Sequence, residues 1–303
     1  MTAPPGFTAR PATIADAEAL ADLINTYDRT HLEEPDHVDA DEVEGWWARI
    51  DLGRDTRFYF DDDDGRLAAA AAVHDRGAEV LALDAYTHPD HAGRGLGTAM
   101  LAWLEEEAAA RGRRPRTSAL AADRSAADLV VGRGYEAVRH FYVMAIDLRD
   151  EPPEPAWPAG LTVSPMRAGE ERTVHAVVEE AFAEHWGHDP RTFEDWTVRN
   201  LDQPWWDPSL VYLVRQTDEV VAVEICAIRF GGGFVGVIGT RKPWRGLGIG
   251  RALLLRAFGD LYRRGERRIT LAVDAGNETG ALQLYESVGM HAAWQSDVYD
   301  RRL

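Results

Sequence analysis

The sequence is poor in cysteine and in long apolar runs. A single cysteine, Cys226, occurs among 303 residues, so no disulfide can form within the chain. No apolar stretch approaches the roughly 20 residues that a membrane-spanning helix needs, and the segment "MTAPPGFTARPAT" lacks the apolar core of a secretory signal. We therefore expect a cytoplasmic protein that does not enter a membrane.

Positive charge is also scarce. The chain has 33 lysine and arginine residues against 51 acidic ones, which gives a formal net charge of −18. Such a charge repels phosphate backbones, so the sequence predicts no nucleic-acid partner. It would attract a cationic substrate weakly, although an acidic surface kept for solubility explains the same composition.

The two halves of the chain resemble each other. "GFTARPA" from Gly6 matches "GLTVSPM" from Gly160 at an offset of 154, and "GRGLGTAML" from Gly93 matches "GLGIGRALL" from Gly246 at an offset of 153. Two more glycine pairs keep nearly the same spacing: Gly112 with Gly265, and Gly134 with Gly289. A steady offset indicates a duplicated domain.

A proline-rich segment separates these halves. "RDEPPEPAWPAG" is typical of a semi-rigid linker, so we expect domains over residues 1–148 and 160–303, joined by residues 149–159. Each half runs from a strand through helices to three strands, a glycine loop, a long helix, a strand, a helix and a last strand. This order predicts an α/β fold, with a central sheet in each half and helices on both faces.

The glycine loop of the second half precedes an amphipathic helix. In "RGLGIGRALLLRAF", Gly246, Gly248 and Gly250 stand before apolar residues with helical spacing. Free N–H groups at such a helix start, with the positive end of the helix dipole, favour a bound phosphate, and glycines allow close approach. Arg245 and Arg251 add positive charge.

Two common phosphate motifs do not fit this loop. A P-loop needs a lysine after the glycines, and the only lysine, Lys242, precedes them. A dinucleotide-binding loop would follow the first strand of a parallel unit, whereas this one follows several strands.

Two motifs resemble those of the GNAT acyltransferase superfamily. "RGLGIG" is similar to its Arg/Gln-x-x-Gly-x-Gly/Ala loop, and "NETGALQLYESVGM" is similar to its Asn-x-x-x-Ala-x-x-Leu-Tyr-x-x-x-Gly-Phe motif. The resemblance covers both halves and implies two tandem GNAT-like domains, each with a mixed, mostly antiparallel sheet, as in mycothiol synthases. It also implies acetyl-CoA as cofactor, with its pyrophosphate and pantetheine arm held by Arg245, Gly246, Leu247, Gly248, Ile249, Gly250, Arg251 and Asn277. The backbone N–H groups of Ile238, Gly239 and Thr240 are the predicted donors to the oxyanion of the transferred acetyl group, because Gly236 and Gly239 permit a bulge that leaves donors unpaired.

The second motif places three side chains on one helix face. Asn277, Ala281 and Tyr285 are four residues apart and can line a narrow channel for the pantetheine arm. A phenol with a pKa of about 10 suits the protonation of a leaving thiolate, so Tyr285 is the predicted general acid. In the alternative interpretation, Tyr285 packs the core and Asn277 caps the helix.

The general base is harder to assign. Family members often carry a glutamate on the strand before the glycine loop, but residues 234–240 contain no carboxylate. Glu224, inside the apolar run "VVAVEICAI", is the expected substitute, because burial can raise its pKa; a purely structural glutamate explains it equally well. His185, His188 and Asp189 are further candidates.

The first half departs from these motifs. At the same offsets, Ala92 replaces Arg245, Ala122 replaces Asn277 and Val130 replaces Tyr285. We expect one active site, in the second half. A second acetyl-CoA site remains possible at Gly93, Arg94, Gly95, Leu96, Gly97 and Thr98.

The sequence thus predicts an acetyl-CoA-dependent N-acetyltransferase that acts on the primary amine of a small molecule. It predicts no metal, and a monomer or a homodimer. The alternatives are another acyl donor, a hydroxyl acceptor, or a non-catalytic acyl-CoA sensor or scaffold. The joint presence of Tyr285, Asn277 and the complete glycine loop argues against the last of these.

Overall fold

We describe residues 3–276 and 280–301 of a computed structural model, which forms two compact units. The first unit comprises Met1–Tyr142 and Trp294–Leu303, and the second comprises Val143–Ala293. These units differ from the sequence repeats at their ends, because the last ten residues belong to the first unit and residues 143–148 to the second.

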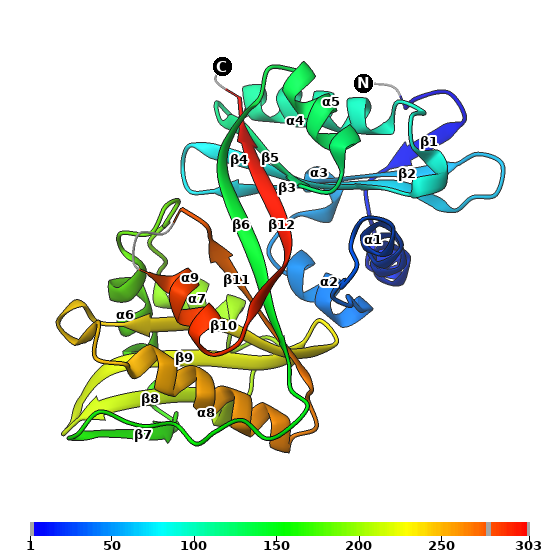
Figure 1. Cartoon of the computed structure of the whole chain (residues 1–303). Coiled ribbons are helices and arrows are strands. Elements are labelled where there is room, and N and C mark those ends of the chain that lie inside the picture. Colours follow the sequence, from blue (N-terminus) through cyan, green and yellow to red (C-terminus); the bar gives the residue numbers. More distant parts are fainter. Residues whose placement is uncertain (1–2, 277–279, 302–303) are drawn as a thin grey trace. The chain divides into compact units, whose positions relative to one another are not determined.

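The first unit contains most of its elements in the order expected from the sequence (Figure 1). Its strands are β1 (Phe7–Arg10), β2 (Thr56–Asp61), β3 (Leu67–Arg76), β4 (Val80–Thr87), β5 (Arg114–Leu120), β12 (His291–Asp300) and β6 (Glu136–Asp147). Its helices are η1 (Ile14–Asp16), α1 (Ala17–His31), α2 (Ala40–Trp47), α3 (Leu52–Asp55), η2 (Pro89–His91), α4 (Leu96–Ala110) and α5 (Arg124–Gly132).

The second unit repeats this order. Besides the end of β6, its strands are β7 (Leu161–Pro165), β8 (Val211–Gln216), β9 (Glu219–Arg229), β10 (Gly232–Thr240) and β11 (Arg268–Asp274). Its helices are α6 (Glu171–Phe182), α7 (Phe193–Arg199), η3 (Pro208–Leu210), η4 (Lys242–Trp244), α8 (Ile249–Arg263) and α9 (Ala281–Ser287).

The strands of each unit are mixed and mostly antiparallel, as predicted. Among the described residues they are consecutive parts of one 12-stranded sheet, in which the first unit has the order β1-β2-β3-β4-β5-β12-β6 and the second the order β6-β11-β10-β9-β8-β7. In each, four consecutive strands pair antiparallel, and the pair that flanks the glycine loop, β4–β5 or β10–β11, is parallel. The long helix after the loop is the crossover that a parallel pair requires.

The matching glycines also share a backbone conformation. All four pairs that set the repeat have positive φ, for example +75° at Gly93 and +76° at Gly246. L-residues with a side chain rarely adopt these angles, so the turns conserve glycine for a steric reason. The duplication is therefore present in the backbone structure as well as in the sequence.

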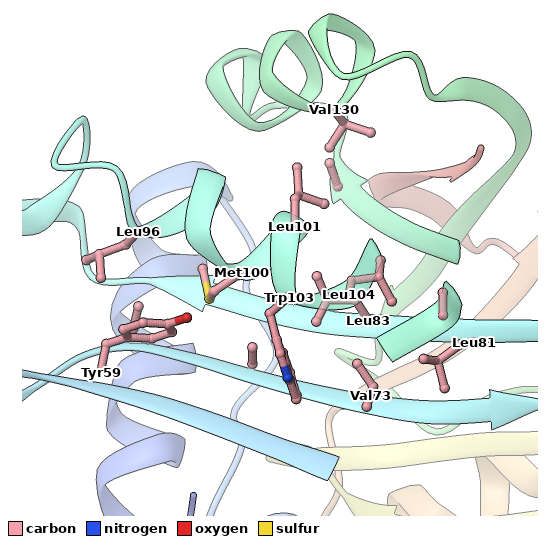
Figure 2. Close-up of a cluster of buried hydrophobic side chains, with 14 of the residues drawn as sticks. Tyr59, Val73, Leu81, Leu83, Leu96, Met100, Leu101, Trp103, Leu104 and Val130 are labelled. Atoms are coloured by element: carbon pink, nitrogen blue, oxygen red, sulfur yellow. The ribbon is translucent and has the colours of Figure 1, made fainter. Parts of the chain in front are cut away.

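Each unit has its own apolar core. In the first unit, Met100 and Trp103 of α4 point toward the strands, close to Tyr59 and Val73 (Figure 2). In the second unit, Val174 and Val177 of α6 pack with alternate residues of β8 and β9. Within residues 3–276 and 280–301, no helix is long and apolar enough to cross a membrane.

Candidate active site

The start of α8 has no side-chain cap. Gly246 and Gly248 have φ values of +76° and +86°, and Gly248 is the N-cap residue. Within the described chain, no side chain bonds to this helix end, whereas Asp39 and Thr192 cap α2 and α7. A Cβ added to either glycine would meet no atom within 4 Å. The first-turn N–H groups can therefore receive an anion such as pyrophosphate.

The third glycine of the loop has a different role. A Cβ on Gly250 would lie 2.9 Å from Cδ2 of Leu284 in α9, and a Cβ on Gly97 would lie 2.9 Å from Cδ2 of Leu129 in α5. In both units this glycine lets the next helix pack closely. Gly250 thus serves helix packing, while Gly246 and Gly248 shape the uncapped start of α8.

The strands on either side of the loop separate. In the described chain, β10 and β11 pair only at Gly233–Ile269 and Phe234–Thr270, and β10 has a bulge between Val235 and Val237. We call the unpaired region, residues 235–240 and 271–274, the β10–β11 gap. The sequence predicted a bulge at this glycine-rich place.

Two backbone N–H groups of β10 point into this gap. Arg241 donates its N–H to the carbonyl of Val221 at 3.0 Å, so Arg241 faces β9. Because neighbouring residues of a strand alternate in hydrogen-bonding direction, Thr240 and Ile238 direct their N–H groups away from β9. Gly239 directs its own toward β9. Of the three predicted backbone donors, Ile238 and Thr240 have the required direction.

Arg245 holds the loop in place. Its Nε donates to the carbonyl of Thr240 at 3.0 Å, and its Nη2 donates to the carbonyl of Ala181 at 3.1 Å. These bonds join the end of β10 to the end of α6. Arg251 and Leu247 are exposed beside the glycines, and Asn277 lies outside the described residues.

Tyr285 lies on α9 and is only 6% exposed. Burial, and then the charge of Glu224, raises the pKa of Tyr285 to about 12. The phenol is therefore protonated at neutral pH, as a general acid must be.

Glu224 is fully buried on β9. Within the described chain, neither carboxylate oxygen has a hydrogen-bond partner. Burial, and then the charge of Asp260, raises the pKa of Glu224 well above its usual value, because an unpartnered buried charge is costly. Burial therefore favours the neutral form of the carboxyl group.

The direction of Glu224 follows from its neighbours. It pairs in register with Ile238 on β10 and with Tyr212 on β8, so these side chains share one face of the sheet. The Tyr212 hydroxyl donates to Oδ2 of Asp260 on α8 at 2.8 Å, and Ile238 approaches Gly250. Glu224 therefore faces α8 and Tyr285, whereas Gly239 faces α6.

The comparisons with known proteins agree with this geometry. The model of the acetyltransferase (GNAT) family matches residues 19–130 and 176–290. The chain belongs to the GNAT family. Because GNAT enzymes use acetyl-CoA, it is an acetyl-CoA-dependent acetyltransferase built as a tandem GNAT.

Similar sequences cover most of the chain, and similar structures cover nearly all of it. Mycothiol acetyltransferase of Nocardiopsis dassonvillei is 30% identical over 278 residues, 80% of this chain and 81% of the other. That of Thermobispora bispora is 33% identical over 223 residues, 71% and 74% of the two chains. A GCN5-related N-acetyltransferase of Sphaerobacter thermophilus is 37% identical, with a TM-score of 0.85 over 99% of this chain and 96% of that one. A tandem GNAT protein from the clavulanic acid pathway shares the fold at 17% identity, with a TM-score of 0.75 over 97% and 98% of the chains.

The first GNAT unit keeps the same anion-site geometry. Gly93 and Gly95 have φ values of +75° and +87°, and α4 also lacks a side-chain cap in the described chain. Arg94 turns away from this helix start, because Nη1 donates to Oδ2 of Asp61 at 2.9 Å and the guanidinium stacks over Phe7. Its predicted role at a second cofactor site is thus not supported by its direction.

Large side chains stand where the first unit would need space. β4 and β5 pair as far as Leu83–Thr117, and Tyr86 follows on β4. Its ring packs edge-on against that of Tyr27 at 5.6 Å, and the Tyr27 hydroxyl donates to Oδ2 of Asp123 at 2.9 Å. By the repeat offsets, Gly239 and Ala181 occupy the positions of the two tyrosines in the second unit.

Three structural residues had no clear sequence signal. Asp61, the first residue of an acidic run over residues 61–64, is only 6% exposed and anchors Arg94. Tyr212 and Asp260 become neighbours of Glu224 only through the sheet register and the packing of α8. Among the described residues, no group of three or more His, Cys, Asp or Glu side chains could hold a metal ion.

Proposed function

We propose that the second unit transfers the acetyl group of acetyl-CoA to the primary amine of a small molecule. The uncapped start of α8 beside the β10–β11 gap carries this proposal. The amides of this helix start would hold the pyrophosphate, and the gap would receive the pantetheine arm. The names of the mycothiol acetyltransferase relatives support a small amino compound as acceptor.

In this proposal, the N–H groups of Ile238 and Thr240 stabilise the negative charge that develops on the acetyl oxygen. Each preorganised donor of this kind typically lowers the activation barrier by about 3–4 kcal/mol. Tyr285 donates a proton to the departing sulfur. An ionised Glu224 raises the pKa of Tyr285, so in this proposal the protonated form of Glu224 leaves the phenol the better acid.

This role for Glu224 differs from the base expected from the sequence. A base must reach the amine, which we expect on the α6 side, and Glu224 faces α8. A neutral carboxyl group also has no free charge with which to accept a proton.

The first unit, in this proposal, binds coenzyme A without transferring an acetyl group. Its open helix start supports binding. The contact between Tyr86, Tyr27 and Asp123 blocks the place where donor and acceptor would meet, and Val130 replaces the acid.

Calorimetric titration with coenzyme A and an assay of CoA release test the proposal. A panel of amino acids, amino sugars, amino thiols and polyamines serves as acceptors. We expect acceptor-dependent CoA release, and we expect Tyr285→Phe to lower kcat at least about tenfold at nearly unchanged coenzyme A affinity. No binding heat, or equal activity of the variant, would remove the respective assignment.

A further inference from the structure

His185 lies on the α6 face of the second unit, near the end of β10. A Cβ on Gly239 would lie 3.0 Å from Cβ of Ala181 and 3.5 Å from Cε2 of Phe182, so the last turn of α6 packs directly on β10. The His185 ring lies against that of Phe182, with 4.4 Å between ring centroids. Its side chain is therefore on the face opposite to Glu224.

The end of α6, next to His185, is tied to the mouth of the β10–β11 gap. Arg245, just after β10, binds the carbonyls of Thr240 and Ala181 and so fixes the end of α6 beside this mouth. The charges that act on His185 include those of Arg245 and of Asp274, the last residue of β11. Charged residues at the ends of both strands that border the gap therefore act on His185.

The surroundings of His185 keep its imidazole neutral. Burial lowers the pKa of His185 below its usual 6.5, the charges of Arg245 and His188 lower it further, and Asp274 opposes them. The exposed Glu184 beside it forms an ion pair with Lys242. A neutral imidazole at pH 7 can accept a proton.

We propose that His185 is the general base that accepts the proton of the attacking amine. This inference rests on the proposed acetyl transfer in the second unit. The amine nitrogen forms the C–N bond, the C–S bond breaks with its electron pair going to sulfur, His185 takes the proton from nitrogen, and Tyr285 supplies the proton to sulfur. Solvent then returns the proton from His185 to Tyr285.

This assignment separates the two proton transfers onto opposite faces of the sheet. Tyr285 and Glu224 lie on the α8 side, and His185 lies on the α6 side. An acceptor that enters beside Phe182 would meet the base before it reaches the gap. Strand β10, which carries no carboxylate, would then need none.

Steady-state CoA release with His185→Ala and His185→Gln tests the proposal. The acceptor is the panel amine with the highest turnover. We expect kcat to fall about 10²- to 10⁴-fold, with the KM for acetyl-CoA changed less than twofold. Added imidazole should restore part of the activity of His185→Ala. His175→Gln is the matched control, because His175 lies on α6 and contacts the carbonyl of Arg191.

The pH dependence of kcat provides a second readout. The unchanged protein should lose kcat at acid pH as His185 becomes protonated, and His185→Gln should lack this limb. A variant within twofold of the unchanged protein would overturn the base assignment alone. A loss without imidazole rescue and with the acid limb retained would show a packing role and overturn it too. If the unchanged protein releases no CoA with any amine, the proposed function and the base assignment both fail.

Discussion

Replacing Glu224 with glutamine should remove a pH-dependent loss of stability from the second unit. The unfolded chain releases the Glu224 proton near its ordinary pKa of 4.5, whereas burial holds the pKa of Glu224 well above that value in the folded unit. Between these two values the folded state binds more protons than the unfolded state. Its stability therefore falls as the pH rises through this window.

The size of this effect follows from the single proton. A difference of one proton changes the free energy of unfolding by at most about 1.4 kcal/mol per pH unit. For a unit of this size, 1 kcal/mol shifts Tm by about 2–4 °C, so Glu224 should lower Tm by up to about 3–6 °C per pH unit. Glu224→Gln should lose this slope, since the amide does not titrate.

Calorimetric melting at half-unit steps from pH 4.5 to pH 8 measures the difference. The stability gap between Glu224→Gln and the unchanged protein should widen as the pH rises. Glu286→Gln, at an exposed position on α9, is the control and should follow the unchanged protein. Parallel melting curves would refute a neutral, buried Glu224. In the CoA-release assay the variant should keep kcat within about threefold, whereas a base would lose about 10²-fold or more.

Three further predictions concern the two GNAT loops and α5. Gly248→Ala should lower stability by about 1–2 kcal/mol, because alanine resists the left-handed angle, and should weaken coenzyme A binding in calorimetry; an unchanged affinity would contradict the anion site. Gly95→Val should reduce the calorimetric stoichiometry from two coenzyme A molecules per chain to one and spare turnover, and lost turnover would reverse the assignment of units. Asp123→Ala should cost about 2 kcal/mol or more in urea unfolding, because it removes the α5 cap and leaves the Tyr27 hydroxyl unpaired; Tyr27→Phe should cost about 1 kcal/mol, and equal losses would refute the cap.

The sequence alone determined the elements that depend on local patterning. Short apolar runs set the strands of both units, and the positive-φ glycines, Gly93 and Gly246 among them, set the repeated turns. The two motifs at residues 245–250 and 277–290 pointed to the GNAT family because both are continuous in sequence. These features need no knowledge of distant contacts.

The placement of side chains across the sheet was beyond sequence reasoning. Glu224 was a candidate base because burial was expected of it, but its face of the sheet depends on its register with Ile238 and Tyr212. A shift of one residue along a strand reverses every side chain, and only the paired strands fix that register.

The local sequence pattern thus determined the secondary-structure elements and the motifs of this protein, and the tertiary structure decided which side chains lie next to one another. The sequence identified a tandem acetyltransferase and its glycine loops, and it predicted Tyr285 as the general acid. Only the folded chain placed His185 on the face opposite to Glu224, brought the rings of Tyr27 and Tyr86 into contact, and joined Trp294–Leu303 to the first unit. The physical reason is that periodicity and turn chemistry act over a few residues, whereas register, helix packing and strand pairing join residues far apart in the chain.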